Sequence, residues 1–290
     1  GMRIGVVFPQ TELGGDAGAV RAYAQGAEEL GFGHVLIYDH VVGADPAAHP
    51  DWSGPYDVHT TFHEPMVLFG YLAALTSMEL VTGILILPQR PTVLAAKQAA
   101  EVDLLTNGNF RLGVGIGWNY VEYEALGQDF RTRGKRLDEQ ITLLRRLWTE
   151  EAVTFHGTFD HITGAGLSPL PVQRPIPVWA GARSPVAYRR VGRTADGWFP
   201  MLSPGPDLDE ARRIVGAAAT AAGRDPARIG MEGRVAWRGD PDQVAGQLRQ
   251  WQEAGATHVS VNTMGAGLAG VDDHLSVLAT AFAAAKDVAS

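Results

Sequence analysis

An acidic residue and an imidazole stand side by side at the end of an apolar run. The segment Gly33–Tyr38 is followed directly by Asp39 and His40. A histidine beside a carboxylate can orient a substrate, shuttle a proton or sit against a cofactor ring. Asp39 could equally cap the segment that follows, so the pair leaves a catalytic and a structural interpretation open.

A glycine-rich stretch, GVGIGWN over residues 113–119, is the second candidate for chemistry. It lacks the last glycine of a dinucleotide-binding motif, because Trp118 stands at that place. Gly117 nevertheless predicts backbone that a flat ring can approach closely, and Asn119 predicts a helix N-cap. Tight packing between strands is the structural alternative.

A third candidate is the segment Gly181, Ala182, Arg183 and Ser184, which leads directly into a helical pattern. A small-residue turn at a helix N-terminus offers unpaired backbone N–H groups and the positive end of the helix dipole. Arg183 and Ser184 add side-chain donors. The sequence therefore predicts a phosphate cradle, although such turns also occur with nothing bound.

Histidines are concentrated in the first quarter of the chain, which raises the question of a metal site. The spacings argue against one, because there is no His-x-His pair and no His-Glu-x-x-His motif. We therefore predict no metal. The residues concerned are His34, His40, His49, His59 and His63.

Composition narrows the function further. The 290 residues carry a net charge of −8 without a basic run, which argues against nucleic acid or an anionic membrane as a partner. The chain has no cysteine, which excludes disulfides, thiolate metal sites and a cysteine nucleophile. No apolar run reaches the roughly 18 residues of a membrane span, and no signal peptide is recognisable, so we expect a cytoplasmic protein.

These candidate residues need a scaffold, and the sequence repeats one unit in which a short, mostly apolar run precedes an amphipathic helical stretch. Nearly continuous apolar runs are typical of parallel strands covered on both faces. The helical stretches include 17–30, 92–105, 137–148 and 240–254. The eight predicted strands are Arg3–Pro9, Gly33–Tyr38, Leu80–Leu87, Phe110–Ile116, Ile176–Ala180, Gly197–Met201, Ile229–Trp237 and Thr257–Asn262.

Eight strand–helix units in a chain of this length predict a (β/α)₈ TIM barrel, with a doubly wound sheet as the rival fold. We expect one domain over residues 2–290 and interpret Gly1 as an expression-tag remnant. Two insertions depart from the unit. Residues 41–62, after strand two, predict a lid on the catalytic face; residues 152–175, before strand five, are expected to start from the opposite face unless they fold back.

Taken in order, the motifs resemble the luciferase-like monooxygenases, and within them the branch of F420-dependent oxidoreductases. The resemblance extends from Met2 to about Met201 and becomes generic beyond it. It rests on blocks such as VFPQTE, YDHVVGADP, FHEPMVLFGYLAALT, LVTGILILPQRPTVLAAKQAAEVDLLTNGNFRLGVGIGWNYVEYEALG, RGKRLDEQ and PVWAGA.

The resemblance implies that a flavin, either F420 or FMN, lies across the carboxyl ends of the strands. It places a cis peptide behind the ring at Gly83-Ile84 and the reactive ring carbon beside Asp39 and His40. The cofactor-binding residues that it implies are Gly83, Ile84, Gly117, Asn119, Gly181, Ala182, Arg183, Ser184 and Met201. The residues expected to line the substrate pocket are Trp118, His63 and Glu64.

The chain departs from relatives at two of these positions. Ala182 replaces a second glycine of the phosphate turn, and Trp118 stands where sugar-phosphate dehydrogenases of the family carry a glutamate proton donor, which puts that activity in doubt. We therefore predict hydride transfer between F420 and a small organic substrate, by a homodimer. The alternatives are an FMN-dependent monooxygenase using O₂, a non-catalytic flavin-binding protein and an unrelated metal-dependent hydrolase.

Overall fold

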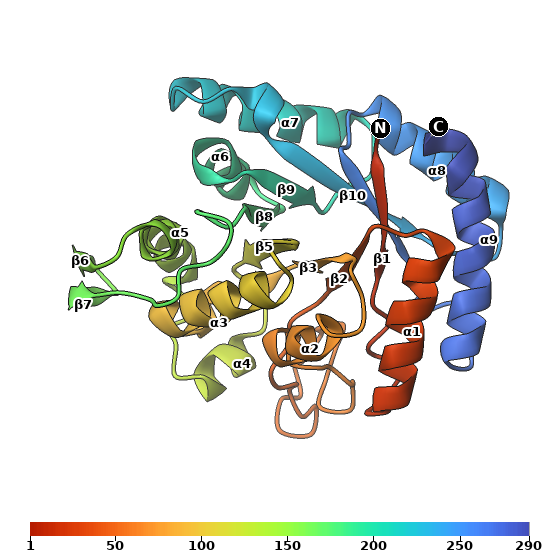
Figure 1. Cartoon of the computed structure of the whole chain (residues 1–290), viewed down its shortest axis with the longest axis horizontal. Coiled ribbons are helices and arrows are strands. Elements are labelled where there is room, and N and C mark those ends of the chain that lie inside the picture. Colours follow the sequence, from red (N-terminus) through yellow and green to blue (C-terminus); the bar gives the residue numbers. More distant parts are fainter. Residues whose placement is uncertain (290) are drawn as a thin grey trace.

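The fold is a closed barrel of eight parallel strands surrounded by helices, which confirms the predicted (β/α)₈ architecture (Figure 1). The computed structural model describes residues 1–289, so Ser290, the last residue of the predicted domain, lies outside the described residues. The barrel strands are β1 (Arg3–Val7), β2 (His34–Ile37), β3 (Glu79–Thr82) continued by β4 (Leu85–Ile86), β5 (Phe110–Gly115), β8 (Val178–Ala182), β9 (Gly197–Pro200), β10 (Gly230–Ala236) and β11 (His258–Asn262).

Closure of the barrel decides between the two predicted folds. Strand β1 pairs in parallel with both β2 and β11, and β3 pairs with β5, so the sheet has no free edge. Inward-facing apolar residues form a cluster inside the barrel, while a larger cluster fills the space between strands and helices. The inner cluster contains Val7, Leu36, Val81, Trp179 and Phe199.

The third barrel strand differs from the prediction of one continuous run over Leu80–Leu87. It is interrupted after Thr82 by a cis peptide bond between Gly83 and Ile84, as the family resemblance implied. Two residues of β4 follow, and the 3₁₀ turn η1 (Leu87–Gln89) ends the strand. The carboxyl end of this strand therefore turns sharply at the mouth of the barrel.

The helices form the outer layer, and several begin or end at capping residues. Asp16 accepts hydrogen bonds from the first turn of α1, and Gly31 ends that helix at φ 112°. Asp240 caps α8 in the same manner. The helices are α1 (Ala17–Leu30), α2 (Pro65–Leu72), α3 (Thr92–Leu105), α4 (Tyr120–Ala125), α5 (Arg133–Thr149), α6 (Pro185–Thr194), α7 (Pro206–Ala221), α8 (Pro241–Glu253) and α9 (Val271–Ala289).

The two insertions are a long loop after β2 and a segment with a hairpin before β8. Residues 38–64 form a long loop without helix or strand that follows β2 at the catalytic end of the barrel (Figure 1). The second insertion contains an antiparallel hairpin, β6 (Val153–His156) and β7 (His161–Ala165). It folds back along α5, because Glu139 accepts the N–H groups of residues 158–160 and Thr92 at the start of α3 bonds to Asp160.

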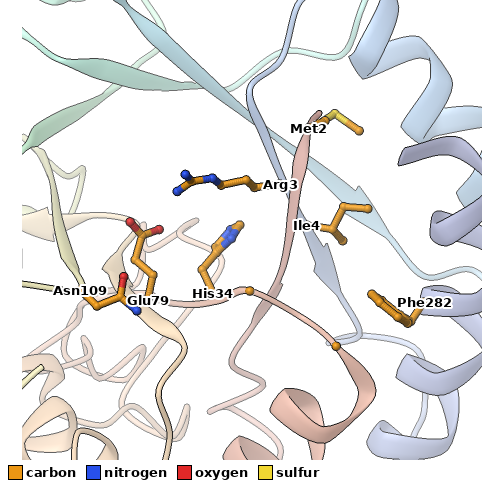
Figure 2. A pocket seen from close by; sticks show the side chains of 9 residues that line it. Met2, Arg3, Ile4, His34, Glu79, Asn109 and Phe282 are labelled. Carbon is orange, nitrogen blue, oxygen red and sulfur yellow. The ribbon is translucent and has the colours of Figure 1, made fainter. Parts of the chain in front are cut away.

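A hollow of about 300 Å³ opens at the amino ends of the strands, opposite the predicted catalytic end. Arg3, His34 and Glu79 point toward it from three neighbouring strands (Figure 2). Deeper inside the barrel, Glu232 lies 3.2 Å from His34 and 2.9 Å from Arg111. Buried charges at this end are thus paired with one another.

No helix within residues 1–289 is long and apolar enough to cross a membrane.

Candidate active site

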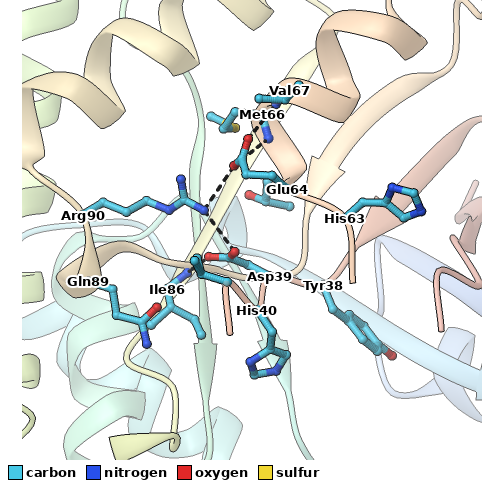
Figure 3. A network of polar contacts seen from close by, with 12 residues as sticks. Tyr38, Asp39, His40, His63, Glu64, Met66, Val67, Ile86, Gln89 and Arg90 are labelled. Atoms are coloured by element: carbon cyan, nitrogen blue, oxygen red, sulfur yellow. Dashed lines mark hydrogen bonds and ion pairs between the residues drawn. The ribbon is translucent and has the colours of Figure 1, made fainter. Parts of the chain in front are cut away.

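Asp39 is fixed at the end of β2 by two donors, one from β4 and one from the residue that follows the turn η1. Its Oδ2 accepts the Ile86 N–H at 2.9 Å, and its Oδ1 lies 3.0 Å from Arg90 Nη2 (Figure 3). Burial, with Glu122 in addition, raises the pKa of Asp39, although Arg90 and the Ile86 N–H act in the opposite direction. Asp39 therefore ties β2 to β4, and its carboxylate is directed away from His40.

His40 instead faces a second carboxylate. Its Nδ1 lies 3.5 Å from Glu122 Oε1, and the Glu122 side chain is completely buried. Glu122 accepts the Val41 N–H at 2.6 Å and a bond from Gln89 Nε2 at 2.8 Å. Burial alone would raise the pKa of Glu122, but the contacts with His40, Gln89 and Val41 outweigh it and lower that pKa. The site therefore contains an ionised carboxylate behind the imidazole.

Sequence reasoning missed Glu122, although a signal was present. Asn119 and Glu122 stand three residues apart at the start of α4, the spacing of a capping box. Asn119 does cap this helix, since its Oδ1 accepts the Glu122 N–H at 3.1 Å. The Glu122 carboxylate, however, does not return to its own helix but bonds the backbone of the loop after His40. The sequence spacing therefore singles out Glu122, but its contact with the Val41 backbone can be seen only in the folded structure.

Three aromatic rings surround the other faces of His40. Tyr56 and Phe62 come from the long loop, with ring centroids 5.3 and 4.8 Å from the imidazole. Trp118 follows β5, at 5.4 Å, and also contacts Trp52 of the loop. Most of the imidazole is thus shielded, since only 11% of the His40 side chain is exposed. This arrangement fits the predicted position of Trp118 in a pocket wall, while its contact with substrate stays a prediction.

An apolar floor closes the barrel beneath this wall. Ile84, just after the cis bond, occupies the space that two glycines of neighbouring strands leave free. A Cβ added at Gly115 would lie 2.7 Å from Ile84 Cδ1, and one at Gly181 would lie 3.3 Å from Ile84 Cγ2. Tyr38 and Met264 complete the partly exposed layer above the inner cluster. Ile84 therefore covers the backbone of β5 and β8 at this end of the barrel.

The predicted phosphate turn differs in detail from the expectation. Gly181 and Ala182 are the last residues of β8 and not part of a turn, since β8 runs two residues beyond the predicted end. Arg183 and Ser184 are exposed and join the strand to α6. Ser184 Oγ accepts the Ala187 N–H and so caps the helix. The segment ends beside the floor, with an exposed guanidinium at a helix N-terminus.

The remaining predicted residues are placed at the mouth, some with structural partners. Gly117 adopts φ 68°, which favours glycine, and Met201 is exposed beyond β9. Asn119 is buried, and its Oδ1 is engaged by the helix cap. His63 Nε2 lies 3.0 Å from the Gly14 carbonyl, while Glu64 caps α2 and lies 3.2 Å from Arg90. Their roles toward cofactor or substrate stay predictions.

The family of the chain follows from comparison with known sequences. The family model described as luciferase-like monooxygenase matches residues 2–238, which is most of the chain. The chain belongs to the luciferase-like monooxygenase family. As a luciferase-like protein it is an oxidoreductase, and the geometry around His40 lies at the carboxyl ends of the strands, where such barrels carry their active sites.

Two curated relatives of this luciferase-like chain illustrate its position in the family. An uncharacterized protein from Mycobacterium tuberculosis is 33% identical over 245 residues, covering 82% of this chain and 84% of the relative. The F420-dependent glucose-6-phosphate dehydrogenase of Intrasporangium calvum is 31% identical over 239 residues, covering 78% of this chain and 67% of the enzyme.

Solved structures share the fold at low sequence identity. The monooxygenase RslO1 from Streptomyces bottropensis has a TM-score of 0.80 at 20% identity, and each chain is covered completely. An F420-dependent secondary alcohol dehydrogenase in complex with an F420-acetone adduct has a TM-score of 0.79 at 16% identity, over 97% of this chain and 99% of that one. These likenesses confirm the luciferase-like barrel.

Proposed function

We propose that this luciferase-like protein is an F420-dependent oxidoreductase that transfers hydride between the deazaflavin and a small organic substrate. The observation that carries the proposal is His40, which follows β2 at the carboxyl end of the barrel and is backed by the buried Glu122. The glucose-6-phosphate dehydrogenase relative, named F420-dependent, supports this cofactor. The secondary alcohol dehydrogenase was solved with an F420 adduct and has the same fold.

The residues at the mouth fit a planar ring that carries an anionic tail. The floor offers an apolar surface through Ile84, which packs over Gly115 and Gly181. For the tail, Arg183 offers a guanidinium at the N-terminus of α6. Among the first three residues of α6, Pro185 has no N–H and the Ala187 N–H bonds to Ser184. The Val186 N–H is left to bind a ligand.

His40 and Glu122 supply the proton chemistry in this proposal. When bound, F420 supplies hydride transfer and reacts poorly with O₂. The ionised Glu122 beside Nδ1 favours the tautomer that carries its proton there, which leaves Nε2 to exchange a proton with a substrate oxygen. Tyr56, Phe62 and Trp118 restrict water at this nitrogen and hold the imidazole in place. In the reducing direction, His40 would give a proton to the oxygen of a carbonyl whose carbon accepts the hydride.

An FMN-dependent monooxygenase is the alternative, since the floor does not distinguish a flavin from a deazaflavin. The likeness to RslO1, named a monooxygenase, keeps it open. A non-catalytic flavin-binding protein is a further alternative. A homodimer with a small-molecule substrate stays part of the proposal, and the cytoplasmic location stays an expectation.

A direct titration tests the choice of cofactor. The purified chain is mixed with oxidised F420 or FMN, and binding is followed by fluorescence. The expected result is tighter binding of F420, followed by anaerobic oxidation of reduced F420 with at least one acceptor from a panel of carbonyls, enones and imines. Tighter binding of FMN with O₂ consumption would support the monooxygenase, and binding without turnover of any acceptor would support a carrier protein.

A further inference from the structure

A second cation lies inside the barrel mouth, on the strand opposite His40. Arg234 stands on β10, two residues after Glu232 and therefore on the same inward face, one step nearer the carboxyl end. Its guanidinium carbon lies 4.9 Å from the centroid of the Tyr38 ring, which follows β2. The arginine side chain thus reaches across the interior and is only partly exposed.

Among the described residues, Arg234 has no counter-charge, in contrast to two other arginines of the barrel strands and their carboxyl ends. Arg111 pairs with Glu79 and Glu232, and Arg90 pairs with Asp39 and Glu64. No carboxylate within residues 1–289 lies in ion-pair reach of Arg234, and its Nε is buried without a hydrogen-bond partner. A cation shielded from water and left unpaired is unfavourable, and it favours binding of an anion from outside.

The neighbours of Arg234 connect it to the proposed active site. Its charge acts on Tyr56, whose pKa is raised by burial and by Tyr38 while Arg234 opposes the rise. The Tyr56 ring in turn packs 5.3 Å from His40. The nearby carboxylates are engaged elsewhere, since Asp39 bonds Arg90 and Glu122 bonds the backbone after His40. An anion beside Arg234 would therefore meet an aromatic wall shared with His40.

We propose that Arg234, flanked by Tyr38 and Tyr56, binds a carboxylate of the substrate, so that the substrate class is small organic acids. This inference rests on the proposed function for the chemistry at the neighbouring His40. The flat guanidinium matches a carboxylate in a two-bond geometry, and one such cation balances its single negative charge.

Binding of a simple anion tests the site without the cofactor. Benzoate serves as the probe and benzamide as its neutral counterpart, and the readout is the shift in melting temperature of the chain alone. We expect benzoate, and not benzamide, to raise the melting temperature of the parent. In Arg234→Gln the apparent benzoate affinity should fall about 10- to 100-fold, the range for a charge-assisted hydrogen bond. Arg234→Lys should retain part of it.

Controls separate a local effect from a loss of charge or of fold. Arg249→Gln removes one exposed positive charge on α8 and should leave the benzoate shift unchanged. Equal responses to benzoate and benzamide, or an unchanged benzoate affinity in Arg234→Gln, would overturn the proposal. If Arg234→Gln does not fold, a parent that shows no preference for benzoate over benzamide overturns it equally.

Turnover provides a second arm that distinguishes substrate from cofactor. The parent is assayed with oxo acids and enoic acids and with the matching primary amides, using reduced F420. We expect Arg234→Gln to lose its preference for the acids while the F420 affinity stays the same. A loss of F420 affinity with equal losses for acids and amides would assign Arg234 to the cofactor and overturn the substrate class. If F420 does not bind the parent but benzoate still does, the proposed function fails and the anion site stands.

Discussion

His40 and Asp39 are neighbours in the chain, yet they contact different groups, and this separates their expected roles. The imidazole faces Glu122 and three aromatic rings, whereas the Asp39 carboxylate bonds Ile86 and Arg90. An imidazole that is largely shielded from water and has an ionised carboxylate beside Nδ1 is suited to proton transfer. A carboxylate engaged by two donors is suited to holding strands together.

Replacing the imidazole tests the catalytic role. We expect His40→Ala to bind F420 with unchanged affinity and to lose about 100-fold or more in turnover, the usual contribution of a positioned acid or base. The reason is that His40 packs against Tyr56, Phe62 and Trp118 at the mouth, outside the apolar clusters that hold the barrel together. Steady-state kinetics with reduced F420, alongside a binding titration, measures both quantities. Full turnover with any acceptor that the parent reduces would contradict the assignment.

The two carboxylates offer a matched comparison. Glu122→Gln removes the charge behind Nδ1, and we expect kcat to fall by about tenfold or more while KM changes little, since Glu122 acts through His40. The pKa of Glu122 is lowered, so this carboxylate is ionised throughout the neutral range, and the acid limb of the parent profile does not report its titration. Asp39→Asn should instead destabilise the fold, by about 1–3 kcal/mol, with a smaller change in kcat.

Denaturant unfolding of the two variants completes that comparison. If Asp39→Asn lost turnover as strongly as Glu122→Gln while keeping the parent's stability, Asp39 would have a role in catalysis that its contacts do not indicate. If Glu122→Gln kept full kcat and the parent's pH profile, Glu122 would be a structural anchor of the loop only.

At the level of elements, the N-terminus of α6 is expected to bind the anionic tail of the cofactor. Pro185 lacks an N–H, and the Ala187 N–H is already bonded to Ser184 Oγ, so the first turn of α6 has few backbone donors left for an anion. The exposed guanidinium of Arg183 is therefore expected to provide much of the binding. We expect Arg183→Ala to weaken cofactor binding by roughly 1–3 kcal/mol at low salt and less at high salt. Arg189→Ala, an exposed charge on the same helix, is the control. An unchanged affinity at both salt concentrations would remove Arg183 from the site.

The long loop after β2 is expected to respond to the cofactor. It contains no helix or strand, and its internal bonds belong to isolated turns and side-chain contacts, such as Val58 N–H to the Ala44 carbonyl at 2.8 Å and Trp52 Nε1 to the Tyr56 carbonyl at 3.0 Å. A loop of this kind opens more easily than the barrel strands. We expect amide exchange over residues 41–62 to slow when F420 binds, while α8 stays unchanged as an internal reference. Equal exchange with and without cofactor would show that the loop is not a lid.

The elements themselves were largely predictable from the sequence. Eight apolar runs and capped helices such as Ala17–Leu30 and Thr92–Leu105 follow from local patterns, and the structure confirms those two helices to the residue. The contact between Glu122 and the Val41 backbone joins residues 81 positions apart and depends on how the loop returns. Arg234 was missed for the same reason, because a strand pattern does not show whether an inward arginine has a partner.

Across the whole molecule, charge is distributed along the barrel interior. The amino end contains a buried, paired set in which Arg111 lies against Trp179, with its guanidinium carbon 4.3 Å from the ring centroid, and between Glu79 and Glu232. The carboxyl end exposes the unpaired Arg234. Since the paired end is engaged internally and the unpaired end opens toward the mouth, stability and binding of anions are assigned to opposite ends of one barrel.

The paired end makes a prediction about acid stability. Burial, followed by the charge of Arg111, lowers the pKa of His258 to about 3. The unfolded chain takes up a proton on this histidine below about pH 6.5, whereas the folded chain does not until near pH 3, so the free energy of unfolding falls as the pH drops through this window. The pKa of Glu232 is lowered by His34 and Arg111 against the effect of burial, so its contribution is lost as the pH falls from the usual carboxyl pKa toward the lower pKa of the folded chain.

Urea unfolding at pH 7 and pH 5 separates these contributions. The parent should lose more stability between the two pH values than His258→Gln, by about 1–2 kcal/mol after allowance for the partial exposure of the ring. His161 is exposed, so His161→Gln should follow the parent. The other buried histidines cancel in the comparison because they are present in all three chains.

Glu232→Gln should be less stable than the parent at pH 7, by about 3–5 kcal/mol, since it leaves Arg111 without one of its two carboxylates. Identical pH dependence in the parent and His258→Gln would mean that His258 takes up its proton equally in the folded and the unfolded chain and contributes nothing to acid sensitivity above pH 5.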